Sequence, residues 1–545
     1  MRSPVNATST AAAPAPAVSE TLLRELGRTE GGDAIGLLVR DQHARRLVRL
    51  RAVLDAAAAL PAALGPPGAL DRLRADWSLL EAAERADRDA VRTVLLHPLI
   101  GPWSQRCLYG LAAAGGGAGD RTGTGTGREH AGDGERGAGA AGELAADLGH
   151  FGAIAAAAAV HAGLAFTARL TAYGDLLALP TIGALRTHPG ARVDLRLADG
   201  VLTLSQGAAA PPVVVHPVPA PPDRQHRRDT NAARRAGASA ASTRSDDPRW
   251  LPLGTLPALV PGAAPVLLDD LDPYRTAGSG LERHGLGAVT RLDPASRAAW
   301  AASWAGTEPV LRVGGAHRTA EAALLLRCLV PLAPPPGQGP AGESASHCSG
   351  TRREAFGAVL SSRPATPAYF AATLVHELQH TKLSALSTLV RLHEAGPAEA
   401  YFAPWRTDPR PFDGLLQGAY SHLALADYWH RYALTAHSTA ERDLAWAEHA
   451  RCAEQVGAVL PVLTTADTLT TQGRVLVGEM TATYDRLAKE PPPPGHAARA
   501  RAYVSTAHTL WRQRRHTAVR PRTARESVAD TPAEVRGEAE KRPDA

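Results

Sequence analysis

The chain has 545 residues, which corresponds to two to four domain-sized units or to one large domain with insertions. Hydrophobic residues make up 44% of it, enough for a sizeable core, and the net charge of +5 is too small to argue for a nucleic-acid partner. The four cysteines are far apart and form no Cys-x-x-Cys pair, which argues against a zinc ribbon, an iron–sulfur cluster and a disulfide framework.

The N-terminal residues 1–18 are rich in Ala, Pro, Ser and Thr and are predicted to be disordered. The first 20 residues lack the apolar stretch of a secretory signal. The most apolar run of the chain, residues 151–166, is too short to span a bilayer. We therefore expect a cytoplasmic protein with no membrane partner.

Residues 19–217 are predicted to form a mainly helical N-terminal region. Within it, residues 112–142 form a Gly- and Thr-rich low-complexity insertion, and the helical pattern is expected to return over Gly142–Leu179. A β-hairpin is expected near residues 192–205, where Asp199-Gly200 provides a turn between two short stretches of apolar residues that recur at every second position.

Residues 218–248 are first Pro-rich and then Arg-rich. Their arginines could belong to a nucleic-acid-binding tail, but no aromatic residue is interleaved with them before Trp250, so a solvated linker is the preferred interpretation. This linker would lead to a metal-binding catalytic region at residues 249–520, and the charged tail at residues 521–545 is predicted to be disordered.

The strongest motif in the chain is His-Glu-x-x-His at residues 376–380. Thr366-Pro367 provides an N-cap followed by proline at the first helical position, and Gly396 provides a stop, so the motif is predicted to lie on a helix. With 3.6 residues per turn, the two histidines lie on one face and can bind one metal ion. The alternative is a core helix with two hydrogen-bonded histidines, but burying them together with Glu377 and no metal would be costly.

A catalytic metal centre needs a third protein ligand. Glu399 lies 19 residues after His380, the interval at which one large class of zinc peptidases places its glutamate, although a Gly-Pro break just before it leaves no settled helix to aim the side chain. His422 is the rival candidate, in an apolar helical stretch where a lone imidazole needs a reason. The alternative for His422 is a core histidine hydrogen-bonded to the backbone. Glu394 and Asp427 are weaker candidates.

Three blocks carry a family resemblance: LVHELQHTKL (residues 374–383), APWRTDPRP (403–411) and QGAYSHLA (417–424). In this order they resemble the HEXXH motif domain proteins, described as aKG-HExxH-type peptide β-hydroxylases. The resemblance extends less sharply to residues 147–150, 179–183 and 344–346. It covers most of the chain outside the low-complexity insertions.

The resemblance implies an enzyme that depends on Fe(II) and 2-oxoglutarate and hydroxylates a β-carbon in a ribosomally made precursor peptide. By position, it implies His376 and His380 as metal ligands and His422 as the third ligand. Some family members are fused to a radical-SAM domain. This chain has no Cys-x3-Cys-x2-Cys cluster, so it would be a stand-alone form, and any radical-SAM maturase would be a separate partner encoded nearby.

The chemistry of 2-oxoglutarate suggests further site residues. Its distal carboxylate requires a cation with planar, bidentate geometry, which arginine supplies better than lysine. Arg406 and Arg410 lie on a proline-punctuated loop between the two ligand helices, and one of them is predicted to bind this carboxylate. Either could instead bind a peptide carboxylate or a structural aspartate. Glu377 would orient other groups in an oxygenase and would be the general base in a hydrolase.

We therefore expect a mainly α-helical protein with small β elements and a helical metal-binding C-terminal domain, not a jelly roll. The runner-up function is a zinc metallopeptidase that uses His376, His380 and Glu399 with Glu377 as general base. A third possibility is a non-catalytic, metal-containing peptide-binding protein. Closed four-ligand coordination would favour this third function, and an open metal site would favour either enzyme.

Overall fold

The computed structural model describes residues 18–65, 67–116, 132–207, 210–218, 242–276, 286–335, 347–397, 400–406 and 408–519. Within these residues the protein is mainly helical, with three small sheets and no jelly roll, which confirms the predicted fold class. The predicted disordered segments fall outside the described residues, apart from Val18, and so do the central parts of the predicted insertion and linker.

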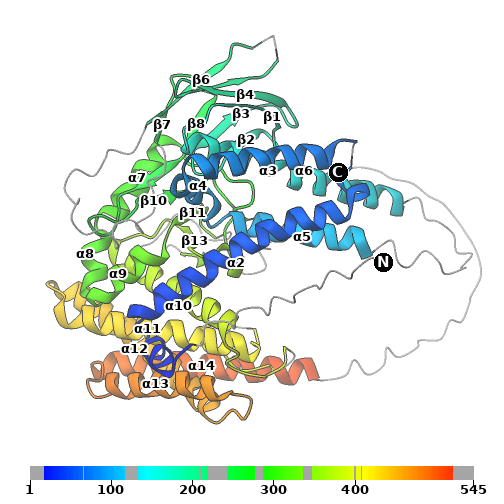
Figure 1. Cartoon of the computed structure of the whole chain (residues 1–545). Coiled ribbons are helices and arrows are strands. Elements are labelled where there is room, and N and C mark those ends of the chain that lie inside the picture. Colours follow the sequence, from blue (N-terminus) through cyan, green and yellow to red (C-terminus); the bar gives the residue numbers. More distant parts are fainter. Residues whose placement is uncertain are drawn as a thin grey trace, which may run out of the picture.

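The first of two large hydrophobic cores lies among the helices of the N-terminal half and the sheet that follows them (Figure 1). Its helices are the second half of α2 (Gly32–Ala59), α3 (Ala69–Ala86), α4 (Arg88–Leu95), α5 (Ile100–Gly116) and α6 (Gly132–His161). Residues 141–161 of α6 form the one stretch, among the described helices, that is long and apolar enough to cross a membrane. Since 78% of the residues in its apolar window are buried inside the protein, α6 packs as a core helix.

The chain after α6 differs from the sequence prediction. The expected helix over Gly142–Leu179 is wrong beyond His161, because Gly163 adopts a positive φ of 63° and the Leu164 amide donates to the Ala159 carbonyl. Two strands follow, β1 (Phe166–Thr171) and β2 (Leu176–Leu179). The alanine-rich run before Gly163 favours a helix, and the sequence prediction extended this helix into β1. In the structure, the residues of β1 alternate between buried and more exposed positions, as in a strand with one buried face.

The predicted hairpin is confirmed as β4 (Arg192–Ala198) and β5 (Val201–Ser205), which pair with Ala198 opposite Val201. Asp199 and Gly200 both have positive φ, as the tightest hairpin turns require. The sheet has the order β1-β4-β5-β6-β7, with β6 (Val213–Val218) and β7 (Ser242–Arg244) antiparallel. The predicted linker, residues 218–248, thus begins at the last residue of β6 and includes β7, the strand that pairs with β6.

A second five-stranded sheet lies between the two cores and has the order β12-β13-β11-β10-β9. Its strands are β9 (Gly254–Leu256), β10 (Val266–Leu268), β11 (Cys328–Leu332), β12 (Ser349–Gly350) and β13 (Ala358–Ser362). The three central strands are parallel, and α7 (Pro294–Ala305), α8 (Thr307–Val313) and α9 (Ala316–Leu325) connect β10 to β11. A third sheet joins β2, β3 (Gly183–Arg186) and β8 (Trp250–Pro252).

The second large core is built by the C-terminal helices (Figure 1). They are α10 (Pro367–Leu389), α11 (Phe412–Thr435), α12 (Thr439–Thr464) and α13 (Thr471–Leu487), and α14 (Pro494–Val519) packs against α12. This core also contains Leu23 and Leu26 of α1 (Glu20–Gly27) and Ile35 and Leu38 of α2. The long helix α2 therefore runs from one core to the other, and residues of the predicted N-terminal region contribute to both.

Helix α10 carries the His-Glu-x-x-His motif and begins as predicted. Thr366 is its N-cap, with its hydroxyl accepting from the Tyr369 amide at 3.3 Å, and Pro367 is its first residue. The predicted stop at Gly396 is too late, because α10 ends at Leu389 and Val390 adopts an extended conformation.

The turn between α1 and α2 is bound by buried side chains from both α10 and α11. The Lys382 ammonium donates to the backbone carbonyls of Thr29 at 3.0 Å and Glu30 at 3.3 Å. The Tyr420 hydroxyl donates to the Leu26 carbonyl at 2.6 Å. The N-terminal turn therefore holds the two helices side by side.

Candidate metal centre

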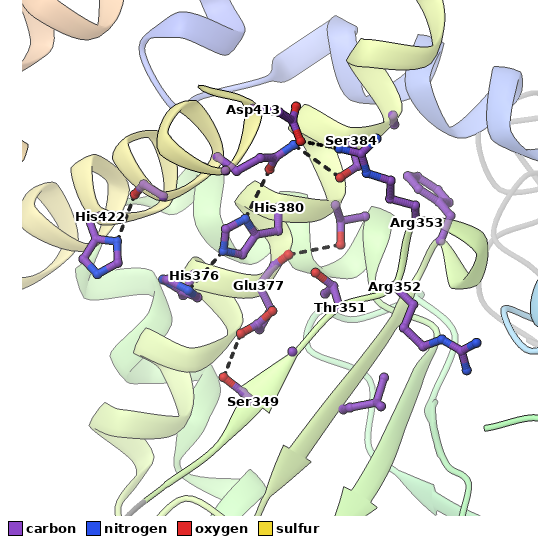
Figure 2. A pocket seen from close by; sticks show the side chains of 18 of the residues that line it. Ser349, Thr351, Arg352, Arg353, His376, Glu377, His380, Ser384, Asp413 and His422 are labelled. Carbon is purple, nitrogen blue, oxygen red and sulfur yellow. Dashed lines mark hydrogen bonds and ion pairs between the residues drawn. The ribbon is translucent and has the colours of Figure 1, made fainter. Parts of the chain in front are cut away.

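Three histidines from α10 and α11 lie together. His376 and His380 are one helical turn apart on α10, and their Nε2 atoms are 3.1 Å apart. His422 comes from α11, and its ring centre lies 5.2 Å from that of His376. Figure 2 shows the three imidazoles side by side, with His376 between the other two. Two nitrogens bound to one metal ion at about 2.1 Å lie roughly 3.0–3.4 Å apart, so the α10 pair already has ligand spacing.

Hydrogen bonds at Nδ1 leave the Nε2 atoms of two histidines free to bind a metal. His380 Nδ1 lies 3.2 Å from the amide oxygen of Gln417, and His422 Nδ1 lies 2.9 Å from the carbonyl of Gly418. Because both oxygens are acceptors, each Nδ1 carries the proton and each Nε2 keeps its lone pair. This is the tautomer that a metal-binding histidine requires, with a second group fixing the ring.

Burial keeps two of these histidines neutral. Together with a smaller effect of nearby positive charge, it lowers the pKa of His376 well below its ordinary value and that of His422 to about 3. His376 Nδ1 is buried and has no hydrogen-bond partner among the described residues. Its Nε2 lies 3.1 Å from the Nε2 of His380, and both atoms can offer a lone pair to one metal ion, so the residues present fit a metal.

The environment of His422 depends on a single glycine. Trp405 stacks on the His422 ring with the ring centres 4.6 Å apart. A Cβ at Gly418 would lie 2.2 Å from the Trp405 ring, so only glycine lets the indole reach His422. Sequence analysis gave no role to Trp405, Gln417 or Gly418, although all three lie in the blocks that carry the family resemblance.

Glu377 is buried beside the histidines. Its Oε1 accepts from the Ser349 hydroxyl at 2.7 Å, and its Oε2 has no partner among the described residues (Figure 2). Burial raises the pKa of Glu377, and the neighbouring His380 opposes this. Ser349 lies on the edge strand β12, which therefore sets the direction of this carboxylate. Nothing in the local sequence links Ser349 to a residue 28 positions later.

A cavity of about 980 Å³ opens at the three histidines and is rich in arginine. Both predicted cosubstrate ligands line it: Arg406 Nε lies 2.8 Å from Asp408, and Arg410 Nη1 lies 3.4 Å from the same carboxylate. Four further arginines also line the cavity, namely Arg49, Arg352, Arg353 and Arg451. Arg451, on α12, pairs with Glu448 and was not predicted, because it is distant in sequence from both ligand helices.

The remaining candidate ligands do not join the three histidines. Glu399 lies outside the described residues. Asp427 is buried in a group of ion pairs with Arg318, Arg431 and Arg486. The side chain of Glu394 is 68% exposed and does not line the cavity.

Replacing Gln417 with alanine should weaken metal binding without unfolding the protein. The change removes the acceptor that orients His380, and the loss of such a partner typically lowers metal affinity about 10- to 100-fold. Equilibrium dialysis against a metal buffer measures this directly. Ser384, whose hydroxyl lies 3.5 Å from the Gln417 amide nitrogen, provides the control: Ser384→Ala should leave affinity within about twofold. Equal affinities for the Gln417 variant and the parent protein would contradict the role of this bond.

In the comparisons with known proteins, no protein-family model matches the chain, and no curated protein matches it either.

Proposed function

We propose that this protein is an Fe(II)- and 2-oxoglutarate-dependent enzyme that hydroxylates a β-carbon of a ribosomally made precursor peptide. The observation that carries the proposal is the site itself. Three buried histidines, two of them with Nε2 left free by their Nδ1 hydrogen bonds, lie in the wall of a large cavity that also contains several arginines. The protein would act in the cytoplasm, with no nucleic-acid or membrane partner. A radical-SAM maturase encoded nearby would be a separate partner.

His376, His380 and His422 would hold the iron and leave three of six positions open, two for 2-oxoglutarate and one for dioxygen. When bound, the metal would supply the oxidation chemistry, in which peptide C–H, 2-oxoglutarate and O₂ become peptide C–OH, succinate and CO₂. The chain's own contribution is to fix the imidazoles, exclude water from the buried face of α10 and bind the two carboxylates of the cosubstrate. A volume of about 980 Å³ is at the upper end of the usual range for ligand pockets, so it has room for the cosubstrate and a peptide side chain.

Arg410 is the best candidate to bind the distal carboxylate of 2-oxoglutarate. Its guanidinium packs against Gly414, and its contact with the Asp408 carboxylate is long at 3.4 Å. Arg406 has a shorter contact of 2.8 Å with the same carboxylate. Because two arginines share one partly exposed aspartate, an incoming carboxylate can bind one of them without leaving Asp408 unpaired.

The test is a visible absorption measurement on protein loaded with iron(II) and mixed with 2-oxoglutarate under argon. We expect the weak charge-transfer band of a chelated iron–oxoglutarate complex. In Arg410→Ala, the 2-oxoglutarate concentration that gives half the band should rise about 10- to 100-fold, because a charge-assisted hydrogen bond contributes about 1.5–3 kcal/mol. Arg391→Ala, which alters an exposed arginine outside the cavity, is the matched control and should behave like the parent protein.

Two results would count against these assignments. Unchanged titrations in both Arg406→Ala and Arg410→Ala would overturn the carboxylate assignment and direct attention to Arg451. The absence of any band in protein that binds iron would overturn the oxygenase proposal.

The alternative is a zinc metallopeptidase, and the free Oε2 of Glu377 is the observation that favours it. A buried carboxylate with a raised pKa and one unpartnered oxygen is suited to take a proton from a metal-bound water. Zinc-loaded protein that cleaves peptides, and loses this activity in Glu377→Gln, would support the peptidase. An oxygenase should keep its iron–oxoglutarate band in the same variant, because Glu377 would only orient neighbouring groups.

A further inference from the structure

A second cluster of metal-binding side chains lies away from the three histidines. His97 lies between α4 and α5, Asp269 follows β10, and Cys328 is the first residue of β11. Each offers one ligand atom, and these atoms all lie within 4.8 Å of one another. All three residues are at least 97% buried. The cluster thus joins the helices of the first core to the sheet between the cores.

No hydrogen bond in the described part of the chain explains the burial of His97. Neither of its ring nitrogens has a hydrogen-bond partner there. Its Nε2 lies 3.6 Å from Asp269 Oδ2, too far for a good hydrogen bond, whereas tetrahedral ligands of one zinc ion lie roughly 3.3–3.7 Å apart. A buried imidazole and a carboxylate at this distance have the spacing of two ligands that bind the same metal ion.

Asp269 also lacks a cation. Its Oδ1 accepts from the amides of Leu271 and Asp272, and this leaves Oδ2 for His97 and the space beside it. No described lysine or arginine forms an ion pair with Asp269. The nearby Arg46 donates instead to the backbone carbonyls of Leu96 and Phe356. Arg275 and Arg297 act on Asp269 without forming an ion pair with it, and burial still raises its pKa, so this carboxylate remains unfavourable without a cation in direct contact.

We propose that His97, Asp269 and Cys328 bind a structural divalent metal ion. The mixed nitrogen, oxygen and sulfur donors favour zinc. Binding replaces the thiol proton of Cys328, which leaves to solvent. One zinc ion, one thiolate, one carboxylate and one neutral imidazole then sum to zero charge, and this makes complete burial acceptable.

Cobalt substitution distinguishes this site from the three-histidine centre, because only this one contains a thiolate. We expect full-length protein titrated with Co(II) to develop a thiolate-to-cobalt charge-transfer band in the near ultraviolet. The band should vanish in Cys328→Ser. It should persist in Cys107→Ser, which alters an equally buried cysteine in the first core, and in His376→Ala/His380→Ala.

Metal analysis provides the second measurement. The His376→Ala/His380→Ala protein, purified without added metal, should retain about one equivalent of zinc, and His97→Gln in the same background should lose it. Absence of the cobalt band in the parent protein would overturn the proposal, and so would a band that survives Cys328→Ser. The cobalt measurement on the parent protein holds even if a variant fails to fold. Neither depends on the oxygenase proposal, which would fail separately through a missing iron–oxoglutarate band.

Discussion

Replacing His380 with alanine should abolish metal-dependent turnover while the protein remains folded. His380 provides one of two nitrogens that already have ligand spacing, and its loss leaves His376 and His422 on different helices with no close pair. A metal ion contributes several kcal/mol to catalysis, and each 1.36 kcal/mol is tenfold in rate, so a loss of about 1,000-fold or more is expected. Succinate release and bound iron should fall together.

His437→Ala is the matched control for this experiment. This exposed histidine lies beyond the end of α11, away from the cavity, and its removal should leave both readouts within about twofold of the parent protein. The same test applied to His422 decides the third ligand. If His422→Ala retained iron and turnover while Glu399→Ala lost them, the ligand set of the zinc peptidase would be favoured instead.

Replacing Lys382 with methionine should destabilise the protein by about 3–5 kcal/mol. The Lys382 side chain is completely buried, and its Nζ lies 3.0 Å from Glu321 Oε2. Removing the cation leaves the Glu321 carboxylate buried without its partner and removes the Lys382 donor from two backbone carbonyls of the α1–α2 turn, of which only that of Thr29 still accepts from Arg318. Urea denaturation measures the change as a lower midpoint with an unchanged slope.

Two further variants show whether the buried charge is responsible. Lys489→Met removes an exposed lysine and should change the free energy of unfolding by less than about 0.5 kcal/mol. Lys382→Met/Glu321→Gln removes both charges and should recover much of the stability that the single change loses, since neither charge is then buried alone. A single variant within about 1 kcal/mol of the parent protein would contradict this account.

Local patterns predicted the parts of the protein that depend on nearby residues. The spacing of His376 and His380, the cap at Thr366 and the hairpin turn at Asp199-Gly200 follow from helical and strand periods that act over a few positions. The strand β1 was missed for the same reason, since the alanines before it favour a helix locally.

Contacts between distant segments could not be predicted in this way. Ser349 contacts Glu377, Arg451 lines the cavity from α12, and Cys328 lies close to His97. These contacts depend on packing between segments far apart in the sequence, which helical and strand periodicity do not reveal. His422 was a candidate because it is a lone imidazole in an apolar helical stretch, and the family resemblance preferred it to Glu399. It lies beside His376 because α10 and α11 pack against each other.

The α1–α2 turn has a consequence for the order in which this protein is completed during synthesis. Lys382 lies 353 positions after Thr29, and Tyr420 lies 394 positions after Leu26, so a nascent chain lacks these two bonds until both ligand helices have emerged. Closing such long loops has an entropic cost that only the finished core can offset. The three histidines are brought together by the same packing of α10 and α11 against the N-terminal turn. Metal capture by these histidines is therefore a late step, and the iron they bind can be used to count molecules in which α10 and α11 have packed together.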